Sequence, residues 1–311
     1  MIAALENSVL VFDIGGSHVA AAVCHRVEGA YRLGRVVSAS HPAEQTCDAF
    51  VGLLHSLGVQ ASAGIGGILG AGLAMPGPFD YSTGVSLMRH KLPYLFGVNL
   101  HQALAARFGW QPSQVRSLND AGAFLLGEIG AGAARGVTRA VGITLGTGIG
   151  SAFAVDGRVV TEGPGVPPGG EIWNLPYEGG IVEDLVSTRA IQGSYRRRTG
   201  KLADVAAIAS AAAVDPAATE AFADFGRHLG QALRILLPAF APEAAVLGGG
   251  ITRSARLFLP AALHALEGLD FKVRIAELLD HAALVGAAVA WFDAFNGSAA
   301  HSAIHSQAQA V

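Results

Sequence analysis

VLVFDIGGSHVAAAV at residues 9 to 23 and AVGITLGTGIGSAFAV at residues 140 to 155 decide the fold of this chain. Each stretch is an apolar run, a tight turn of Gly, Ser or Thr, and a second apolar run, which predicts a strand, a turn and a strand. The repeated pattern predicts two related α/β units. Because glycine turns of this kind hold phosphates, a phosphotransferase is the leading functional hypothesis.

The length of 311 residues exceeds what one core usually takes, and 51% of the residues are hydrophobic. We therefore expect an N-terminal lobe over residues 1–118 and a C-terminal lobe over 119–283. A helix near 284–298 is expected to complete the first lobe. Residues 299–311 read as a flexible tail.

Charge and cysteine content limit the possible partners and the compartment. The net charge is −3 and no run of Lys or Arg occurs among 21 cations, which argues against nucleic acid. Cys24 and Cys47 are too few for a four-ligand zinc site or a disulfide scaffold. The N-terminus has no basic segment of a signal peptide, and no apolar run is long enough to cross a membrane. A cytoplasmic protein is the expectation.

The pattern between the two repeats predicts a short strand at 115–120 followed by a helix at 121–132. Pro76 and Pro78 place a ligand-holding loop after a buried strand. Beyond the second repeat, residues 162–180 are too rich in Gly and Pro for anything but a loop. Helices are expected at 182–197, 202–210, 216–239 and 282–295.

The two turns are candidate phosphate sites. Their glycines permit positive φ and bring backbone N–H groups close to a polyanion, and Ser17 and Thr147 add hydroxyl donors. The turn glycines are Gly15, Gly16, Gly146, Gly148 and Gly150. The alternative is a pair of ordinary hairpin turns. A dinucleotide fingerprint fits poorly, because the β-like FAVDGRVV follows where a helix is needed, and no Walker Gly-Lys-Ser/Thr occurs.

Asn119 and Asp120 lie where the predicted strand ends and the next helix begins. An acid there is most often an N-cap. The helix dipole would also keep Asp120 ionised and able to take a proton from an alcohol, which is the role of a general base in phosphoryl transfer.

The Gly/Pro loop contributes polar groups that suit a polyol. Glu171, Asn174 and Glu183, together with Asn119, could accept and donate hydrogen bonds to a sugar ring, and Trp173 offers an apolar face. The alternative is that these acids are solvated surface residues. The three glycines at 248–250 could admit an adenosine to the backbone or form a plain strand-to-helix turn.

Taken in order, these motifs resemble the ROK family of repressors, open reading frames and sugar kinases, within the actin, hexokinase and Hsp70 superfamily. The matching stretches are DIGGSHVAAAV, the Pro-Gly-Pro loop at 76 to 78, LND at 118 to 120, LGTGIGSA, GGEIWN, GGIVEDLVS and VLGGGI. The resemblance implies a two-lobed ribonuclease-H-like (actin-like ATPase) fold with a nucleotide and sugar cleft between the lobes.

The resemblance also implies roles for single residues. Asp120 corresponds to the family's catalytic base, and Asp13 to the acid associated with Mg²⁺. The residues that correspond to sugar contacts, or lie in matching segments, are Gly77, Asn119, Asp120, Glu171, Asn174 and Glu183. Those on the nucleotide side are Asp13, Gly15, Gly16, Ser17, His18, Gly146, Thr147, Gly148 and Gly249.

Two departures from the family pattern stand out. Asn174 occupies the position of a zinc-binding histidine, and EGGIV at 178 to 182 replaces the cysteine cluster, so the resemblance implies a variant without zinc. His18 stands where relatives often carry a lysine near the phosphates. No helix-turn-helix segment precedes residue 9, which disfavours a repressor.

The motifs and the resemblance together predict an ATP- and Mg²⁺-dependent hexose kinase, foremost a glucokinase, acting on a small sugar, and the resemblance implies a homodimer. Alternatives within the class are an N-acetylhexosamine or N-acetylmannosamine kinase, a fructokinase, and a kinase using polyphosphate. Outside it, a weakly catalytic sugar sensor of the same fold and a dinucleotide-binding oxidoreductase remain.

Overall fold

The computed structural model describes residues 7–294, which divide into two compact units. One unit holds the described residues up to Ala131 and those from His281 onward, and the other is Gly132–Asp280. The division falls after α3 (Asp120–Ala131) and not near residue 118, because α3 packs tightly on the C-terminal helix of the first unit. Residues 295–311, with the expected tail, lie outside the described residues.

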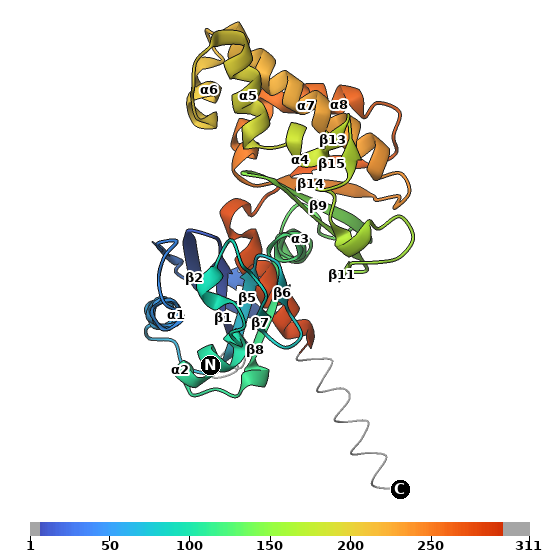
Figure 1. Cartoon of the computed structure of the whole chain (residues 1–311). Coiled ribbons are helices and arrows are strands. Elements are labelled where there is room, and N and C mark those ends of the chain that lie inside the picture. The colour runs from blue at the N-terminus through green and yellow to red at the C-terminus, as the bar shows by residue number, and fades with distance from the viewer. Residues whose placement is uncertain (1–6, 295–311) are drawn as a thin grey trace, which may run out of the picture. The chain divides into compact units, whose positions relative to one another are not determined.

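The first unit is built on a six-stranded sheet with the order β3-β2-β1-β5-β8, in which β4 also pairs with β2 (Figure 1). Strands β2, β3 and β4 run antiparallel to their neighbours, whereas β1, β5 and β8 are parallel. The strands are β1 (Ser8–Ile14), β2 (His18–Val27), β3 (Ala30–Leu33), β4 (Val37–Ser40), β5 (Ile68–Met75) and β8 (Val115–Asn119).

The second unit repeats this topology in a five-stranded sheet of order β11-β10-β9-β14-β15. An antiparallel hairpin series is again followed by two parallel additions. The strands are β9 (Arg139–Leu145), β10 (Ile149–Val155), β11 (Arg158–Val160), β14 (Ala244–Gly248) and β15 (Lys272–Ile275). The prediction of two related units is confirmed, and the segment after the second glycine turn is a strand as expected.

Both faces of the first sheet are covered, as the alternation along β1 requires. Leu10, Phe12 and Ile14 share a core with α1 (Cys47–Ala61) and α2 (Leu100–Phe108). Val9 and Val11 on the opposite face pack with the helix at 282–294 through Leu284, Ala288 and Trp291. The parallel strand ends of this unit are thereby held between two helical layers.

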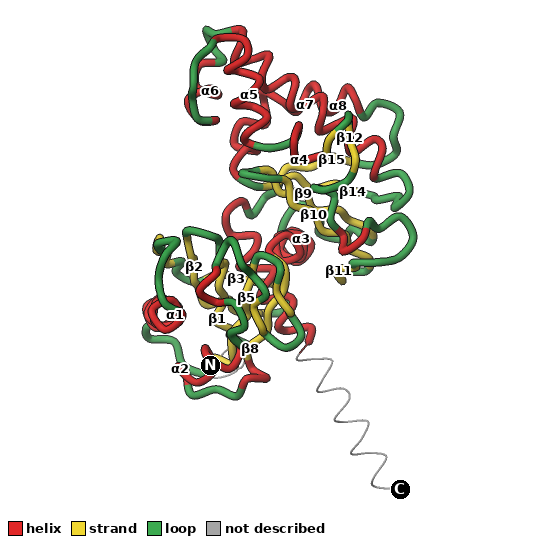
Figure 2. Tube along the Cα trace, viewed as in Figure 1, coloured by secondary structure: helices red, strands yellow, loops and turns green. Residues whose placement is uncertain are grey.

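In the second unit, helices gather on one side of the sheet (Figure 2). Val141, Ile143 and Leu145 of β9 share a core with Phe222, Phe225 and Leu229 of α7. The helices are α4 (Val182–Leu185), α5 (Thr188–Thr199), α6 (Val205–Ala211), α7 (Pro216–Leu236) and α8 (Ala255–Ala265). The expected helix at 182–197 is broken, because Val186 and Ser187 leave helical geometry.

Two small hairpins and several single turns of 3-10 helix complete the elements. β6 (Phe79–Asp80) pairs with β7 (Val85–Ser86), and β12 (Pro176–Tyr177) pairs with β13 (Gly180–Ile181) inside the expected loop. The 3-10 turns are Pro93–Leu95, Pro112–Gln114, Pro168–Gly170, Gly250–Ser254 and Leu279–His281.

Among residues 7–294, no single helix has the length and apolar composition to cross a membrane. Only α6 and α7 taken together have that length and composition, and they are bent by 120° at the break between them.

Candidate functional site

The first glycine turn, Gly15 to Ser17, connects β1 to β2 and is held by a histidine from outside the hairpin. The N–H of Gly15 donates to the carbonyl of His18 at 2.8 Å. His41, which is 5% exposed, donates from Nε2 to the carbonyl of Gly15 at 3.0 Å. A carbonyl only accepts, so Nε2 must carry the proton. The backbone N–H of His41 binds the carbonyl of Ser17 at 2.9 Å.

The second turn, Gly146 to Gly148, is held in the same way. Thr188 at the start of α5 donates its backbone N–H and its hydroxyl to the carbonyl of Gly146, at 2.9 and 2.8 Å. In both turns the carbonyl of the first glycine is thus fixed from another segment. Because the two groups of a trans peptide point in opposite directions, the next N–H, of Gly16 or Thr147, is directed away from this anchor.

Open space lies beside both turns. A Cβ built on Gly16 or on Gly146 would have no heavy atom within 4 Å. None of the turn glycines at 15, 16, 146, 148 and 150 has positive φ, so that part of the sequence interpretation was wrong. Their value lies in close approach, which fits a phosphate group near the backbone.

Asn119 is the last residue of β8 and Asp120 begins α3, at the edge of the sheet where β1 and β5 also end. Asn119 is the cap of α3: its Oδ1 accepts from the N–H of Ala121 at 2.9 Å and of Gly122 at 3.3 Å. Its Nδ2 donates to the hydroxyl of Tyr81 at 3.2 Å. The amide of Asn119 therefore has a fixed orientation.

The Asp120 carboxyl group is half-buried, and its surroundings change its pKa. Its Oδ1 accepts from the N–H of Ala121 at 2.9 Å. Burial raises the pKa of Asp120 above its usual value, while the positive charge of Lys91 and the N–H of Ala121 oppose this only in part. A carboxylate with a raised pKa takes a proton more readily at neutral pH.

The other predicted residues of the first unit lie around the same strand ends. Asp13 is half-buried on β1, opposite Ala74 of β5. Gly77 lies in the loop after β5, where a Cβ would come within 3.6 Å of the Tyr81 hydroxyl. Ser17 and His18 are exposed. The structure thus gathers these residues along one edge of one sheet.

In the second unit, Glu183 lies against the turn at Gly146 to Gly148. Its Oε2 accepts from the N–H of Ile149 at 3.4 Å, and its Oε1 pairs with Arg189 of α5 at 3.3 Å. A Cβ on Gly148 would lie 2.0 Å from Oε2. Glycine at 148 is therefore what permits this contact.

Glu171 and Asn174 lie on an exposed loop. The Oε2 of Glu171 accepts a hydrogen bond from the indole N–H of Trp173 at 2.9 Å. Glu171 and Glu183 both belong to the second unit. Glu171 accepts a hydrogen bond from Trp173, whereas Glu183 accepts one from Ile149, next to the second turn. Trp173 is 39% exposed and offers an aromatic face beside these polar groups.

The backbone conformation and the close packing at position 249 both require a glycine. Its φ is 86°, and a Cβ there would lie 2.4 Å from the carbonyl oxygen of Leu145, at the end of β9. Gly249 thus lets the end of β14 approach the end of β9, just before the turn at Gly146, and the triple glycine leads into a 3-10 helix.

Several residues that contact these groups were not predicted from the sequence: His41, Tyr81 and Lys91 in the first unit, and Thr188 and Arg189 in the second. His41 and Thr188 are isolated polar residues far from the turns that they hold, so no local pattern identifies them. Arg189 also lines a pocket of about 540 Å³ along α5 with Gln192, Arg196 and Asp204. None of the residues predicted for the site lines this pocket.

Replacing glycines in the second turn should separate its proposed contact with the nucleotide from its contact with Glu183. In Gly148→Ala the new Cβ would displace only the end of the Glu183 side chain, so the fold should persist. If Glu183 binds sugar, the KM for sugar should rise by about tenfold, the loss of one charge-assisted hydrogen bond. Gly146→Ala leaves Glu183 in place but fills space beside the turn, so it should raise the KM for ATP. Steady-state kinetics with each substrate varied would show this, and equal effects on both KM values would contradict it.

Two units of one topology, each with a glycine turn after its first strand, define an actin-like α/β fold of the sugar-kinase type. The chain belongs to the ROK family, whose model matches residues 9–294.

Named relatives agree with this family. The glucokinase of Thermotoga maritima is 28% identical over 248 residues, covering 70% of this chain and 77% of the relative. The N-acetyl-D-glucosamine kinase of Pectobacterium carotovorum is 26% identical over 275 residues, covering 81% and 87%. The crystal structure of a ROK family glucokinase from Streptomyces griseus, in complex with glucose and AMPPNP, superposes with a TM-score of 0.74 at 26% identity, covering 90% of this chain and 98% of that one.

Proposed function

We propose that this protein transfers the γ-phosphoryl group of ATP to a hydroxyl group of a hexose, with glucose as the first candidate. The broader class, a sugar phosphotransferase, follows from the family and its named kinases. The observation that carries the proposal is the pair of anchored glycine turns together with Asp120 at the end of β8, whose pKa is raised by burial.

On the donor side, the N–H groups of Gly16 and Thr147 would bind phosphate oxygens, and Gly249 would lie near the nucleoside. Mg²⁺ bound to ATP needs one or two protein carboxylates, since phosphates and water supply the other ligands. Asp13 provides one such group. No cluster of three potential metal ligands occurs among the described residues, and this chemistry does not require one. Bound Mg²⁺ would neutralise charge on the transferred group.

On the acceptor side, Asp120 would take the proton of the attacking hydroxyl. Asn119, held by Tyr81, would orient the sugar, and Gly77 would leave room for the ring beside the same strand end. Glu171, Asn174 and Glu183 would bind further hydroxyls. Carboxylates and amides in fixed orientation reject sugars that lack the matching hydroxyl group.

A second candidate acceptor is an N-acetylhexosamine, favoured by the Pectobacterium relative. The exposed position of Asn174 would leave room for an acetamido group. A fructokinase and a slow sugar sensor remain further alternatives.

Release of ADP over a panel of hexoses tests the proposal. Turnover with glucose and not with N-acetylglucosamine would support a glucokinase, and the reverse would support the second candidate. Thermal stabilisation by a sugar without ADP release would support a sensor. Absence of both would contradict the proposed function.

We also expect purified protein to hold no stoichiometric zinc. Cys24 is buried on β2 and Cys47 begins α1, so neither cysteine lies in the loop at 162–180. Metal analysis by mass spectrometry checks this, and chelation should leave the melting temperature unchanged. One zinc per chain would overturn the expectation.

A further inference from the structure

The loop that carries Glu171 and Asn174 contains a minimal β-hairpin and leads into α4, where Glu183 lies instead of on the loop as expected. Pro176 pairs with Ile181 and Tyr177 with Gly180. Glu178 and Gly179 between them have φ of 49° and 80°, the two positive values of a tight two-residue turn. A hairpin of this size is not stable by itself in water, so its position must be fixed by contacts elsewhere.

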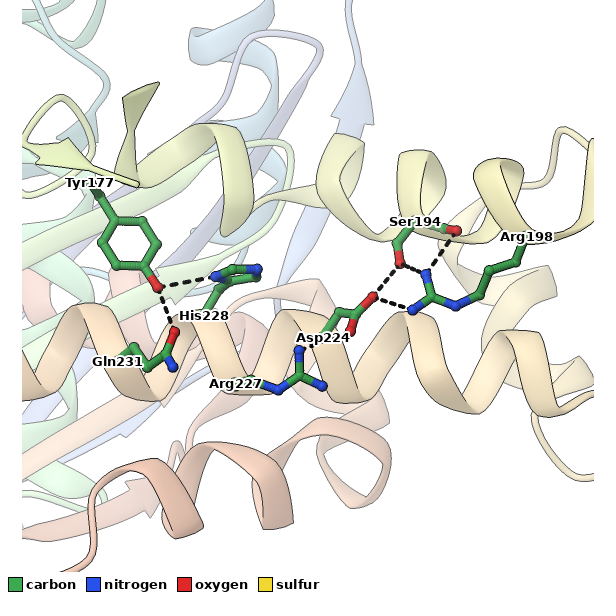
Figure 3. Close-up of polar contacts among 7 residues, drawn as sticks. All are labelled: Tyr177, Ser194, Arg198, Asp224, Arg227, His228 and Gln231. Carbon is green, nitrogen blue, oxygen red and sulfur yellow. Dashed lines mark hydrogen bonds and ion pairs between the residues drawn. The ribbon is translucent and has the colours of Figure 1, made fainter. Parts of the chain in front are cut away.

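Tyr177 supplies that contact. It is 6% exposed, and its hydroxyl donates to Oε1 of Gln231 at 3.0 Å. The same oxygen lies 3.0 Å from Nδ1 of His228. His228 and Gln231 are three residues apart on α7 and so share one face of that helix. Figure 3 shows the tyrosine ring directed at this face, with both hydrogen bonds meeting at its hydroxyl.

The donors in this cluster are defined. Burial raises the pKa of Tyr177 to about 12, and burial lowers the pKa of His228 below its usual value, so both groups are neutral at pH 7. The amide oxygen of Gln231 can only accept. The tyrosine proton therefore points to Gln231, and His228 carries its proton on Nδ1 and donates it to Tyr177.

α7 anchors a second segment one turn earlier. Asp224 accepts hydrogen bonds from Ser194 at 2.8 Å and from Arg198 at 2.7 Å, both on α5, and from Arg227 at 3.0 Å (Figure 3). α5 begins with Thr188 and Arg189, which bind Gly146 and Glu183. One face of α7 thus fixes both the hairpin and α5, the helix that contacts the turn at Gly146 to Gly148.

Backbone bonds connect the hairpin to the predicted sugar ligands. The N–H of Val182 donates to Leu175 and that of Glu183 to Trp173, each at 3.0 Å. At the start of the loop, Ser151 of β10 donates to the carbonyl of Gly170 at 2.6 Å. The loop is therefore held at two points, by Ser151 near Glu171 and by Tyr177 near Glu183.

We propose that Tyr177 is a positioning residue for the sugar: through His228 and Gln231 it fixes the hairpin that sets Asn174 and Glu183. This inference rests on the proposed sugar-kinase function and adds a determinant of acceptor affinity outside the groups that touch the substrate. Loss of the Tyr177 hydroxyl should weaken sugar binding without slowing phosphoryl transfer at saturating sugar.

The test compares Tyr177→Phe with Tyr195→Phe. Tyr195 is also 6% exposed and donates to Asp215 at 2.8 Å, but it lies near the far end of α5. Both variants lose one buried hydroxyl and should lower the melting temperature to a similar extent. Only Tyr177→Phe should raise the KM for sugar, by about three- to tenfold, with kcat and the KM for ATP within about twofold of wild type.

A second pair of variants, at Gln231, separates the hydrogen bond that positions Tyr177 from the packing of its ring. Gln231→Glu keeps an acceptor for the tyrosine and should retain the wild-type KM, whereas Gln231→Leu should raise it as Tyr177→Phe does. A wild-type sugar KM in Tyr177→Phe, or an equal rise in Tyr195→Phe, would overturn the inference. Failure of the wild-type protein to phosphorylate any hexose would instead refute the proposed function, and sugar-induced thermal stabilisation of the same variants would then decide the role of Tyr177.

Discussion

Asp120→Asn should lower kcat by about 10²–10⁴-fold, the usual contribution of a general base, while the protein still binds sugar. The substitution keeps the shape of the side chain and removes its ability to accept a proton. Coupled measurement of ADP release gives kcat, and calorimetric titration gives the affinity for sugar. A kcat near wild type would remove Asp120 from the mechanism.

Asp48→Asn is the matched control, because Asp48 is also an acid in the first turn of a helix of the same unit. It is exposed and pairs with Arg107, so its loss should change kcat by less than about twofold.

The raised pKa of Asp120 also predicts two opposite dependences on pH. The base must be ionised to act, so kcat should fall on the acid side around a pKa higher than that of an ordinary carboxyl group. The stability of the fold should change with pH in the opposite direction to kcat. Since the folded pKa exceeds the unfolded one, the contribution of Asp120 to stability is full below the unfolded pKa and is lost as pH rises through the folded pKa.

Asp120→Asn should therefore leave the melting temperature at neutral pH equal or higher while activity is lost. Lys91→Met should raise the pKa of Asp120 further and move the acid limb of the kcat profile to higher pH. A profile unchanged by Lys91→Met would contradict the electrostatic assignment.

Gly286→Ala should destabilise the first unit by about 3 kcal/mol or more, at or above the upper range for overpacking. A Cβ on Gly286 would lie 1.7 Å from the carbonyl oxygen of Ala123 and 2.6 Å from its carbon. These are backbone atoms of α3 that no side-chain movement can relieve. Urea unfolding monitored by circular dichroism measures the loss.

Gly52→Ala provides the comparison, since Gly52 lies within α1 and its Cβ would meet nothing within 4 Å. Alanine favours a helix over glycine, so this variant should be more stable by about 0.5–1 kcal/mol. Equal unfolding free energies for the two variants would show that the C-terminal helix does not pack on α3 as described.

Local patterns sufficed for much of the fold. The alternating apolar residues around both glycine turns define β1, β2, β9 and β10, and the expected helix at 216–239 matches α7 (Pro216–Leu236). Asn119 and Asp120 were also placed correctly at the junction of a strand and a helix, because that junction depends only on nearby residues.

The features that were missed depend on distant parts of the chain. The hairpin at Tyr177 is fixed by α7, about fifty residues later, and the first turn by His41, which belongs to neither strand. The first unit extends to Ala131 because α3 packs on a helix from the end of the chain. Because the helix is broken at Val186 and Ser187, Thr188 begins α5 and binds the carbonyl of Gly146. Helical periodicity in the sequence does not predict such a contact.

In the proposed function, the anchoring of both turns by His41 and Thr188 affects which phosphoryl donors can bind. A turn that is ordered before the ligand arrives loses little conformational entropy on binding, so most of the gain from each phosphate contact appears as affinity. Such contacts would recognise the phosphate groups of a donor and not its base or sugar. Inorganic polyphosphate and nucleoside triphosphates of any base would satisfy such contacts equally, so the proposed use of ATP would require selective groups beyond the turns.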